Sequence, residues 1–94
     1  MDIKRLQTFC AVYEQRSFSK AADILYLAQP TISTHIANLE QELAAPLFDR
    51  SARSVLPTQA GEILYTHAQD MISLRQQAQT EIGLLMGTVS GRLC

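Results

Sequence analysis

The chain has 94 residues, of which 47% are hydrophobic and 18% are charged, and its formal net charge is −1. This composition excludes a disordered chain and predicts one small globular domain, or one domain with an appendage. A near-neutral charge gives no support to nucleic-acid binding, so any attraction for phosphate must come from locally placed basic side chains.

The sequence contains no pattern typical of an enzyme, a metal site or a membrane protein. It lacks a nucleophile paired with a base, an evident pair of catalytic carboxylates and a glycine-rich phosphate loop, so we expect no catalytic activity. Cys10 and Cys94 are too few for a disulfide framework, and His35 and His67 have no companions at metal-ligand spacing. No signal segment or membrane-length apolar run is present, which predicts a cytoplasmic protein without membrane contact. We also expect no cofactor in this chain.

Three helices are predicted in the first half of the chain. Apolar residues recur at helical spacing over about 2–15, and Ser17 is a candidate N-cap for a second, shorter helix. Pro30 fixes the start of a third helix, which is expected to run to about Leu43. The close succession of two short helices over about 18–37 predicts a helix-turn-helix.

The third helix divides into an apolar face and a polar face. Its apolar residues are Ile32, Ile36, Leu39 and Leu43. Its polar stripe consists of short uncharged side chains, namely Thr31, Thr34, His35 and Asn38. Such a face suits a helix that lies in the major groove and contacts base edges, although a solvated face is the alternative. We expect Gln29 and Ser33 to hold a phosphate or a base, and Pro30 with the Thr31 methyl to pack on a thymine methyl.

Two short apolar segments, 45–48 and 55–57, flank a polar stretch that contains Arg50 and Arg53. The pattern predicts a β-hairpin, although no Asn-Gly or Asp-Gly turn marks it. Arg53 is expected to enter a narrow minor groove, and Arg50 to contact the flanking phosphate. Lys20, on the second helix, is a further candidate for phosphate contact. A solvated charge is the alternative for Arg53 and for Lys20.

A long linker helix is predicted over 59–87, about 40 Å in length at about 1.5 Å per residue. Its stripe follows steps of three and four, as in a coiled coil, and the predicted dimerisation residues are Leu64, Ala68, Met71, Arg75, Ala78, Ile82 and Leu85. A head made of residues 1–58 cannot cover both ends of such a rod, so the stripe predicts a second copy of the chain. Arg75 either snorkels out of an ordinary seam or fixes the register of an antiparallel pair.

Together these features resemble the N-terminal DNA-binding region of LysR-type transcriptional regulators. The residues that carry the resemblance are Leu6, Phe9, Ser17-Phe18-Ser19, Ala21-Ala22, Gln29-Pro30, Ser33, Ile36, Leu39-Glu40, Leu43, Leu47-Phe48-Asp49-Arg50, Arg53, Thr58 and Ala60-Gly61. The resemblance implies a mainly α winged helix-turn-helix over 1–58, with three helices and a short β-hairpin wing, followed by a dimerisation linker helix. It also implies an effector-binding domain beyond the chain, with 88–94 starting the connection to it. A full-length protein of this kind is expected to form a tetramer and to bind a small-molecule effector, whose identity stays unknown.

The sequence departs from the usual pattern of that family at four positions. Ala28 stands where a serine often caps the third helix, and Thr34, Ala37 and Asn38 stand where arginine or lysine is frequent. Phosphate neutralisation therefore falls mostly to the wing, and we expect about four to six phosphate contacts in a dimer.

The predicted function is that of a bacterial, sequence-specific transcription regulator. It is expected to bind double-stranded, dyad-related operator DNA as a homodimer, with the third helix in the major groove and the wing on the backbone or in the minor groove. Two alternatives remain open. One is a coiled-coil interaction module that uses the helix-turn-helix for protein contacts, and the other is a complete small repressor.

Overall fold

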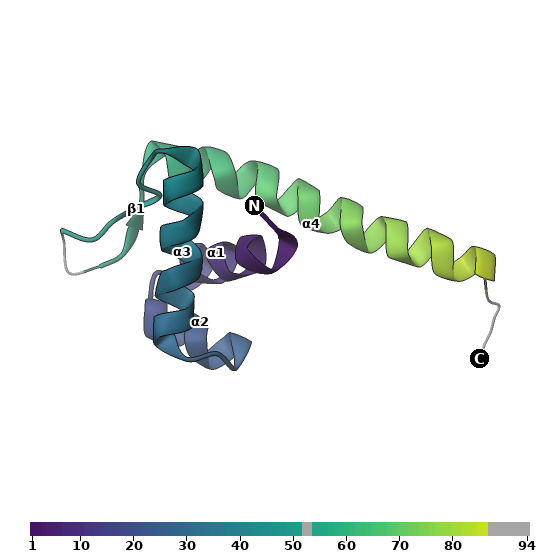
Figure 1. The fold of residues 1–94 in the computed structure, drawn as a ribbon, viewed down its shortest axis with the longest axis horizontal. Helices are drawn as coiled ribbons and strands as arrows, with labels where there is room; N and C mark the ends of the chain where they lie inside the picture. The colour runs from purple at the N-terminus through teal and green to yellow at the C-terminus, as the bar shows by residue number, and fades with distance from the viewer. Residues whose placement is uncertain (52–53, 87–94) are drawn as a thin grey trace.

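The computed structural model describes residues 1–51 and 54–86, and it consists of a helical head from which one long helix projects (Figure 1). The elements in chain order are α1 (Ile3–Gln15), α2 (Phe18–Leu25), α3 (Gln29–Leu43), β1 (Phe48–Asp49), β2 (Leu56–Pro57) and α4 (Gln59–Met86). The two strands pair antiparallel, with Phe48 opposite Pro57. The predicted three helices, hairpin and long C-terminal helix are thereby confirmed.

Short polar side chains set the starts of three helices. The side chains of Asp2, Ser17 and Thr58 accept hydrogen bonds from the third amide beyond them, at 2.8, 3.1 and 3.1 Å. α3 has no such bond, because its N-cap residue is Ala28. Its start depends instead on Pro30, whose fixed φ angle suits the first helical turn.

α1 lies at the centre of the core, because α2, α3 and α4 all pack against it. Phe9 of α1 is fully buried, and its ring lies 5.3 Å from the ring of Phe48, so the root of the hairpin is attached to α1. Tyr13 stacks on Tyr65 of α4 with ring centroids 3.8 Å apart. These aromatic contacts hold the hairpin and α4 in fixed positions relative to the helix-turn-helix.

The first turns of α4 belong to the core of the head. Leu64 is 7% exposed and Ala68 is fully buried, both within the same cluster as the residues of α1. The prediction that these two residues face a second copy is therefore wrong. Burial against the chain's own head and burial against a second copy produce the same stripe of apolar residues in the sequence. Here α1 covers the first part of the stripe, because the core of the head continues past residue 58.

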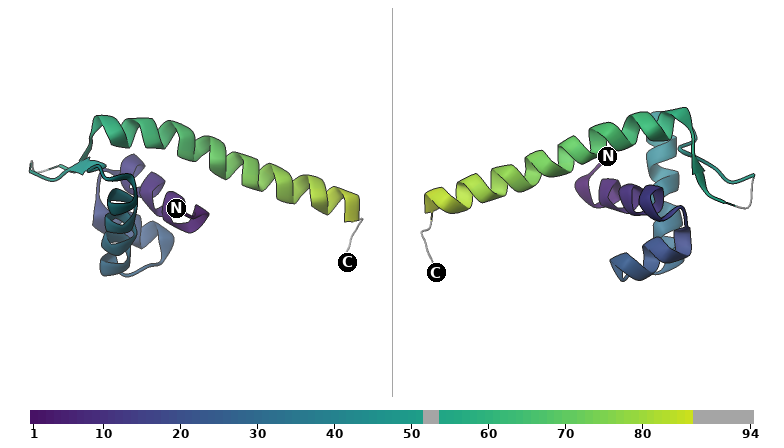
Figure 2. Two further views of the ribbon diagram at one scale, coloured as in Figure 1. Left: turned by 45° about the horizontal axis from the view of Figure 1, so that its top comes forward. Right: turned by 180° about the vertical axis from the view of Figure 1, so that it is seen from behind.

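Beyond the head, α4 is surrounded by solvent on all sides (Figure 2). Of the other predicted dimerisation residues, Met71 is half-buried, whereas Arg75, Ala78, Ile82 and Leu85 are exposed. The predicted connection over 88–94 lies outside the described residues. Among the helices of 1–51 and 54–86, none combines the length and the hydropathy that a membrane span requires.

Candidate nucleic-acid interface

The rotation of α3 is fixed by Ile32, Ile36 and Leu39, which are all fully buried. The opposite side of the helix is exposed, and its central residues are Pro30, Thr34, Ala37 and Gln41. Every one of these side chains is uncharged. The centre of the outward face of α3 is thus exposed and uncharged, as expected for a helix that approaches base edges closely.

The remaining predicted residues of α3 lie on its two flanks. Thr31, His35 and Asn38 are half-buried along the flank that faces α1, whereas Gln29 and Ser33 lie on the flank toward the hairpin. The predicted polar stripe therefore runs from the exposed face of α3 toward α1. Thr34 occupies the centre, and its three companions border it on one side.

His35 is tied to the head, because its Nδ1 lies 2.8 Å from Oγ1 of Thr8 on α1. Thr8 is 1% exposed and is the only buried polar residue among those that the structure describes. The sequence pattern gave no sign of this bond. Because this bond occupies Nδ1, Nε2 is the ring nitrogen with which His35 can contact a ligand outside the head.

An open hollow lies between the start of α2, the start of α3 and the hairpin. Its lining residues are Arg16, Ser17, Phe18, Ser19, Gln29, Ser33, Arg50 and Val55. Two arginines and the N-terminal turn of α2 therefore border the same space. Such a concave, positively charged site beside a helix N-terminus suits a phosphate group.

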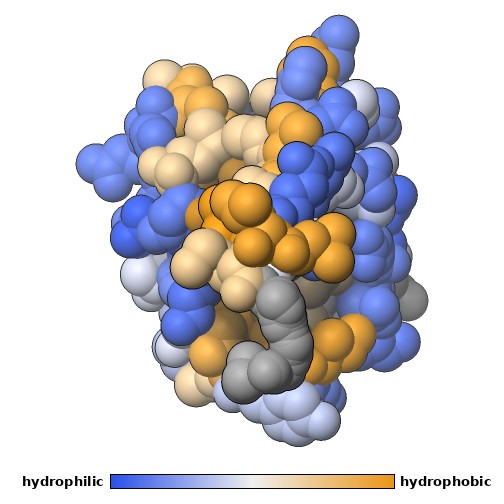
Figure 3. Space-filling model, turned by 90° about the vertical axis from the view of Figure 1, so that its right-hand side faces the viewer, coloured by the Kyte–Doolittle hydropathy of each residue, from blue (hydrophilic) through white to orange (hydrophobic). Residues whose placement is uncertain are grey.

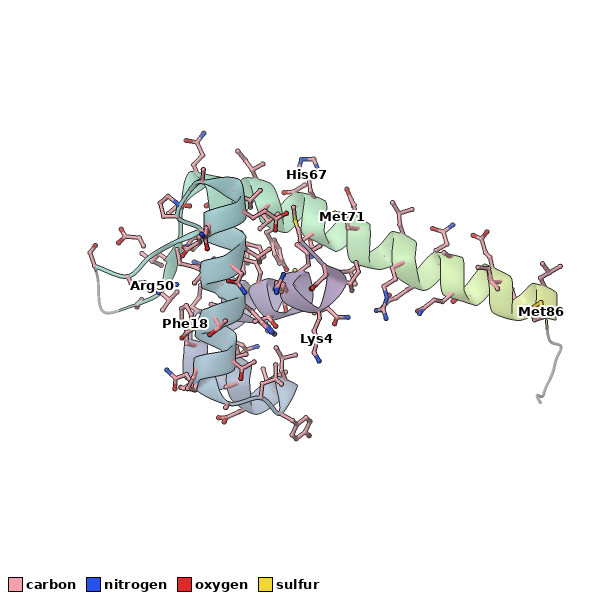
Figure 4. The ribbon with its side chains drawn as sticks, viewed as in Figure 1. Lys4, Phe18, Arg50, His67, Met71 and Met86 are labelled. Atoms are coloured by element: carbon pink, nitrogen blue, oxygen red, sulfur yellow. The ribbon has the colours of Figure 1, made fainter. Side chains whose placement is uncertain are left out.

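Arg50 is oriented by two neighbours. Its Cζ atom lies 4.6 Å from the centre of the Phe18 ring, and Figure 4 labels both residues. One of its terminal nitrogens lies 3.7 Å from Oε1 of Glu40. Glu40 also accepts a hydrogen bond of 2.8 Å from the Leu47 amide through Oε2, which connects the end of α3 to the hairpin root. The Arg50 side chain remains 49% exposed, so it can still contact an incoming phosphate.

The charge of the hairpin is not uniformly positive. The amide and the hydroxyl of Ser51 donate to Oδ1 of Asp49 at 2.9 and 2.6 Å. These bonds hold the pKa of Asp49 below its usual range, so a carboxylate persists beside Arg50. Arg53, the predicted wing-tip residue, lies outside the described residues.

Arg16 is a candidate that the sequence interpretation missed. It adopts the left-handed conformation at the end of α1, with φ 54°, and its Nε donates to the Tyr13 carbonyl at 2.8 Å. A basic residue immediately before the N-cap Ser17 was the available signal. Lys20, by contrast, is exposed on α2 and does not line the hollow.

The described residues contain no cluster of three or more histidine, cysteine or acidic side chains that could hold a metal ion. Cys10 is buried, and burial raises its pKa to about 11, so its thiol is protonated near neutral pH.

Known proteins share this architecture. Residues 3–62 match the lysR family of bacterial regulatory helix-turn-helix proteins. The HTH-type transcriptional regulator CysL of Bacillus subtilis is 43% identical over 88 residues, which cover 94% of this chain and 29% of CysL. A crystal structure of the BenM DNA-binding domain with benA site 1 DNA superposes with a TM-score of 0.87 at 39% identity, covering 90% of this chain and 99% of that domain.

A complex of the CbnR DNA-binding domain with DNA has a TM-score of 0.82 at 30% identity, and the match covers 86% of this chain and 93% of that one. The chain thus corresponds to a whole DNA-binding domain of these structures but spans less than a third of the length of CysL. The sequence match and the fold agree over the same residues. The chain belongs to the lysR family of bacterial regulatory helix-turn-helix proteins.

Proposed function

We propose that this chain is the DNA-binding head and linker helix of a cytoplasmic transcription regulator, with no catalytic activity of its own. The observation that carries the proposal is the neutral, exposed face of α3 lying beside a hollow that contains Arg16 and Arg50. Groove reading and phosphate binding need these two surfaces next to each other. The DNA complexes of the BenM and CbnR domains, which share the fold, support this assignment.

In this proposal the centre of α3 reads bases and its surroundings hold the backbone. Thr34 lies deepest in the major groove, and Thr31, Asn38 and the Nε2 atom of His35 contact the adjoining base edges. The N-terminal turns of α3, which carry Gln29, Pro30 and Ser33, enter the major groove ahead of the rest of the helix. Phosphates are held by Arg50 and Arg16, with Lys20 as an outer contact and Arg53 at the wing tip.

We further propose that α4 pairs with a second copy of the chain. Its exposed large hydrophobic residues are Ile63, Leu74, Ile82, Leu84, Leu85 and Met86, with exposures between 57% and 81%. Figure 3 looks at the end of α4, where hydrophobic residues gather on the surface. Exposure of this many large hydrophobic side chains to water is unfavourable, which supports a dimer through the far part of α4. A tetramer and a small-molecule effector are proposed for a longer protein.

A dimer of this kind would place two α3 helices in successive major grooves, about 34 Å apart, on a dyad-related operator. Fluorescence anisotropy with a labelled duplex of random sequence, repeated over a range of salt concentrations, tests the proposal. We expect binding that weakens with salt, with a log-log slope of about −4 to −5. A chain that shows no salt-dependent binding would instead be an interaction module for proteins.

Two variants with the same loss of charge sharpen this experiment. Arg50→Ala is expected to reduce the magnitude of the salt slope by about 1 for each head. Lys4→Ala removes a cation on α1, well apart from Arg50, and is expected to leave the slope unchanged (Figure 4). Equal slopes for Arg50→Ala and the wild type would refute the phosphate role of the hollow.

A further inference from the structure

The buried hydroxyl of Thr8 makes two hydrogen bonds, one to a partner that can only accept and one to a partner that can accept or donate. Its Oγ1 lies 3.1 Å from the carbonyl oxygen of Lys4 and 2.8 Å from Nδ1 of His35. A hydroxyl has one proton, so Thr8 can donate to only one of these two acceptors, and the contact with the Lys4 carbonyl has Thr8 as the donor. With the hydroxyl proton on the Lys4 carbonyl, the bond to His35 is donated by Nδ1, and this assignment places a ring proton on that nitrogen.

This arrangement decides what the other ring nitrogen can do. In a neutral imidazole with its proton on Nδ1, Nε2 is a hydrogen-bond acceptor. His35 lies one turn after Thr31 and one turn before Asn38, on the same half-buried flank of α3. Nδ1 is held against α1, so any contact of His35 with a ligand in the groove passes through an acceptor.

We propose that Thr8 is a positioning residue that fixes the tautomer of His35, and that Nε2 of His35 accepts a hydrogen bond from the amino group of an adenine or a cytosine. In the major groove, adenine N6 and cytosine N4 are the donors, whereas guanine and thymine present acceptors there. The side chain therefore selects A or C at one position of each half-site. This inference rests on the proposed function, since it requires α3 to lie in the major groove.

The tautomer is measured directly in the free protein. A long-range ¹H–¹⁵N spectrum distinguishes a protonated from an unprotonated ring nitrogen, and a His67→Gln variant assigns the signals because the chain has only two histidines. We expect a protonated Nδ1 in the wild type and in Thr8→Ser, which keeps the hydroxyl. Thr8→Val keeps the shape but removes the acceptor, so the proton should redistribute toward Nε2. A proton on Nε2 in the wild type would overturn the proposal.

The base preference is measured with a duplex selected by the wild-type protein from a random pool, at one fixed pH for all variants. Each adenine is replaced by purine and each cytosine by 2-pyrimidinone, which remove only the amino group. We expect one such replacement in each half-site to weaken wild-type binding by about 5- to 150-fold. His35→Ala and Thr8→Val should be insensitive to that replacement, and Thr8→Ser should behave as the wild type.

The outcomes separate this inference from the proposed function. The protein could select a specific duplex, and every amino-group replacement could then weaken the wild type and His35→Ala equally. That result would overturn the tautomer readout and leave the proposed function intact. Failure to select any duplex would overturn both. Thr8→Ser controls for a folding defect, because it keeps the hydroxyl. If the bond had only a structural role, Thr8→Val would bind more weakly but would remain sensitive to the same amino-group replacement.

Discussion

Gly61, in the first turn of α4, is predicted to be intolerant of even one methyl group. A Cβ atom at this position would overlap the carbonyl oxygen of Leu47 and would lie 3.3 Å from its carbonyl carbon and 3.4 Å from Cβ of Pro57. Leu47 is fully buried, and its carbonyl accepts a hydrogen bond of 3.0 Å from the Thr58 amide. The obstacle is backbone at the root of the hairpin, so it cannot rotate out of the way.

The expected cost of Gly61→Ala follows from three contributions. Overpacking typically costs about 1–3 kcal/mol, and weakening the bond between Thr58 and Leu47 costs about 0.5–1.5 kcal/mol. Replacing glycine by alanine inside a helix returns about 1 kcal/mol. We therefore expect the free energy of unfolding to fall by about 0.5–3.5 kcal/mol, together with weaker DNA binding because the hairpin root is displaced.

Gly83 provides a matched control on the same helix, because a Cβ atom there meets nothing within 4 Å. Gly83→Ala should raise the free energy of unfolding by about 1 kcal/mol through helix propensity alone. Urea unfolding followed by circular dichroism, at one protein concentration for all variants, measures both changes. A Gly61→Ala protein as stable as Gly83→Ala would refute the packing argument.

Three further predictions concern single groups. Ala28→Ser should stabilise the protein by about 0.5–2 kcal/mol by capping α3, whereas Ala37→Ser, which adds the same hydroxyl in mid-helix, should not; urea unfolding compares them. Because burial raises the pKa of Cys10 to about 11, iodoacetamide at pH 8 should alkylate it at least about 100-fold more slowly in the folded than in the unfolded chain, as measured by peptide mass spectrometry. The hydrogen bond to Glu14, at 2.7 Å, raises the pKa of Tyr65 to about 12. Folding thus favours the protonated phenol. The wild type should therefore have a higher free energy of unfolding than Tyr65→Phe below pH 10, and this advantage should be lost as the pH rises from 10 through 12. Unfolding measurements across that pH range test this.

The elements of the fold were predictable because local chemistry determines them. Helical spacing of apolar residues, the polar caps at Ser17 and Thr58, and Pro30 at the start of α3 all act within a few residues of where they stand. The hairpin was predictable from two apolar segments around a polar tip, even without a turn signature. The uncharged outward face of α3 also followed from sequence, since burial of Ile32 and Ile36 fixes the opposite side.

Contacts between elements were not predictable in the same way. A stripe with coiled-coil spacing is equally compatible with burial in the chain's own head and burial against a partner, so Leu64 and Ala68 were misassigned. The bond between Thr8 and His35 joins residues 27 positions apart and depends on how α1 and α3 are rotated against each other. Arg16 reaches the hollow only because the turn between α1 and α2 adopts a left-handed conformation.

The central claim is that the exposed centre of α3 reads bases, and Thr34→Ala tests it most directly. The measurement is the affinity of the wild type and the variant for the selected duplex and for a scrambled duplex at one salt concentration. We expect the variant to lose about 1–3 kcal/mol on the selected duplex for each base contact removed, with unchanged binding to the scrambled one. Equal losses on both duplexes, or no loss on either, would contradict groove reading by α3.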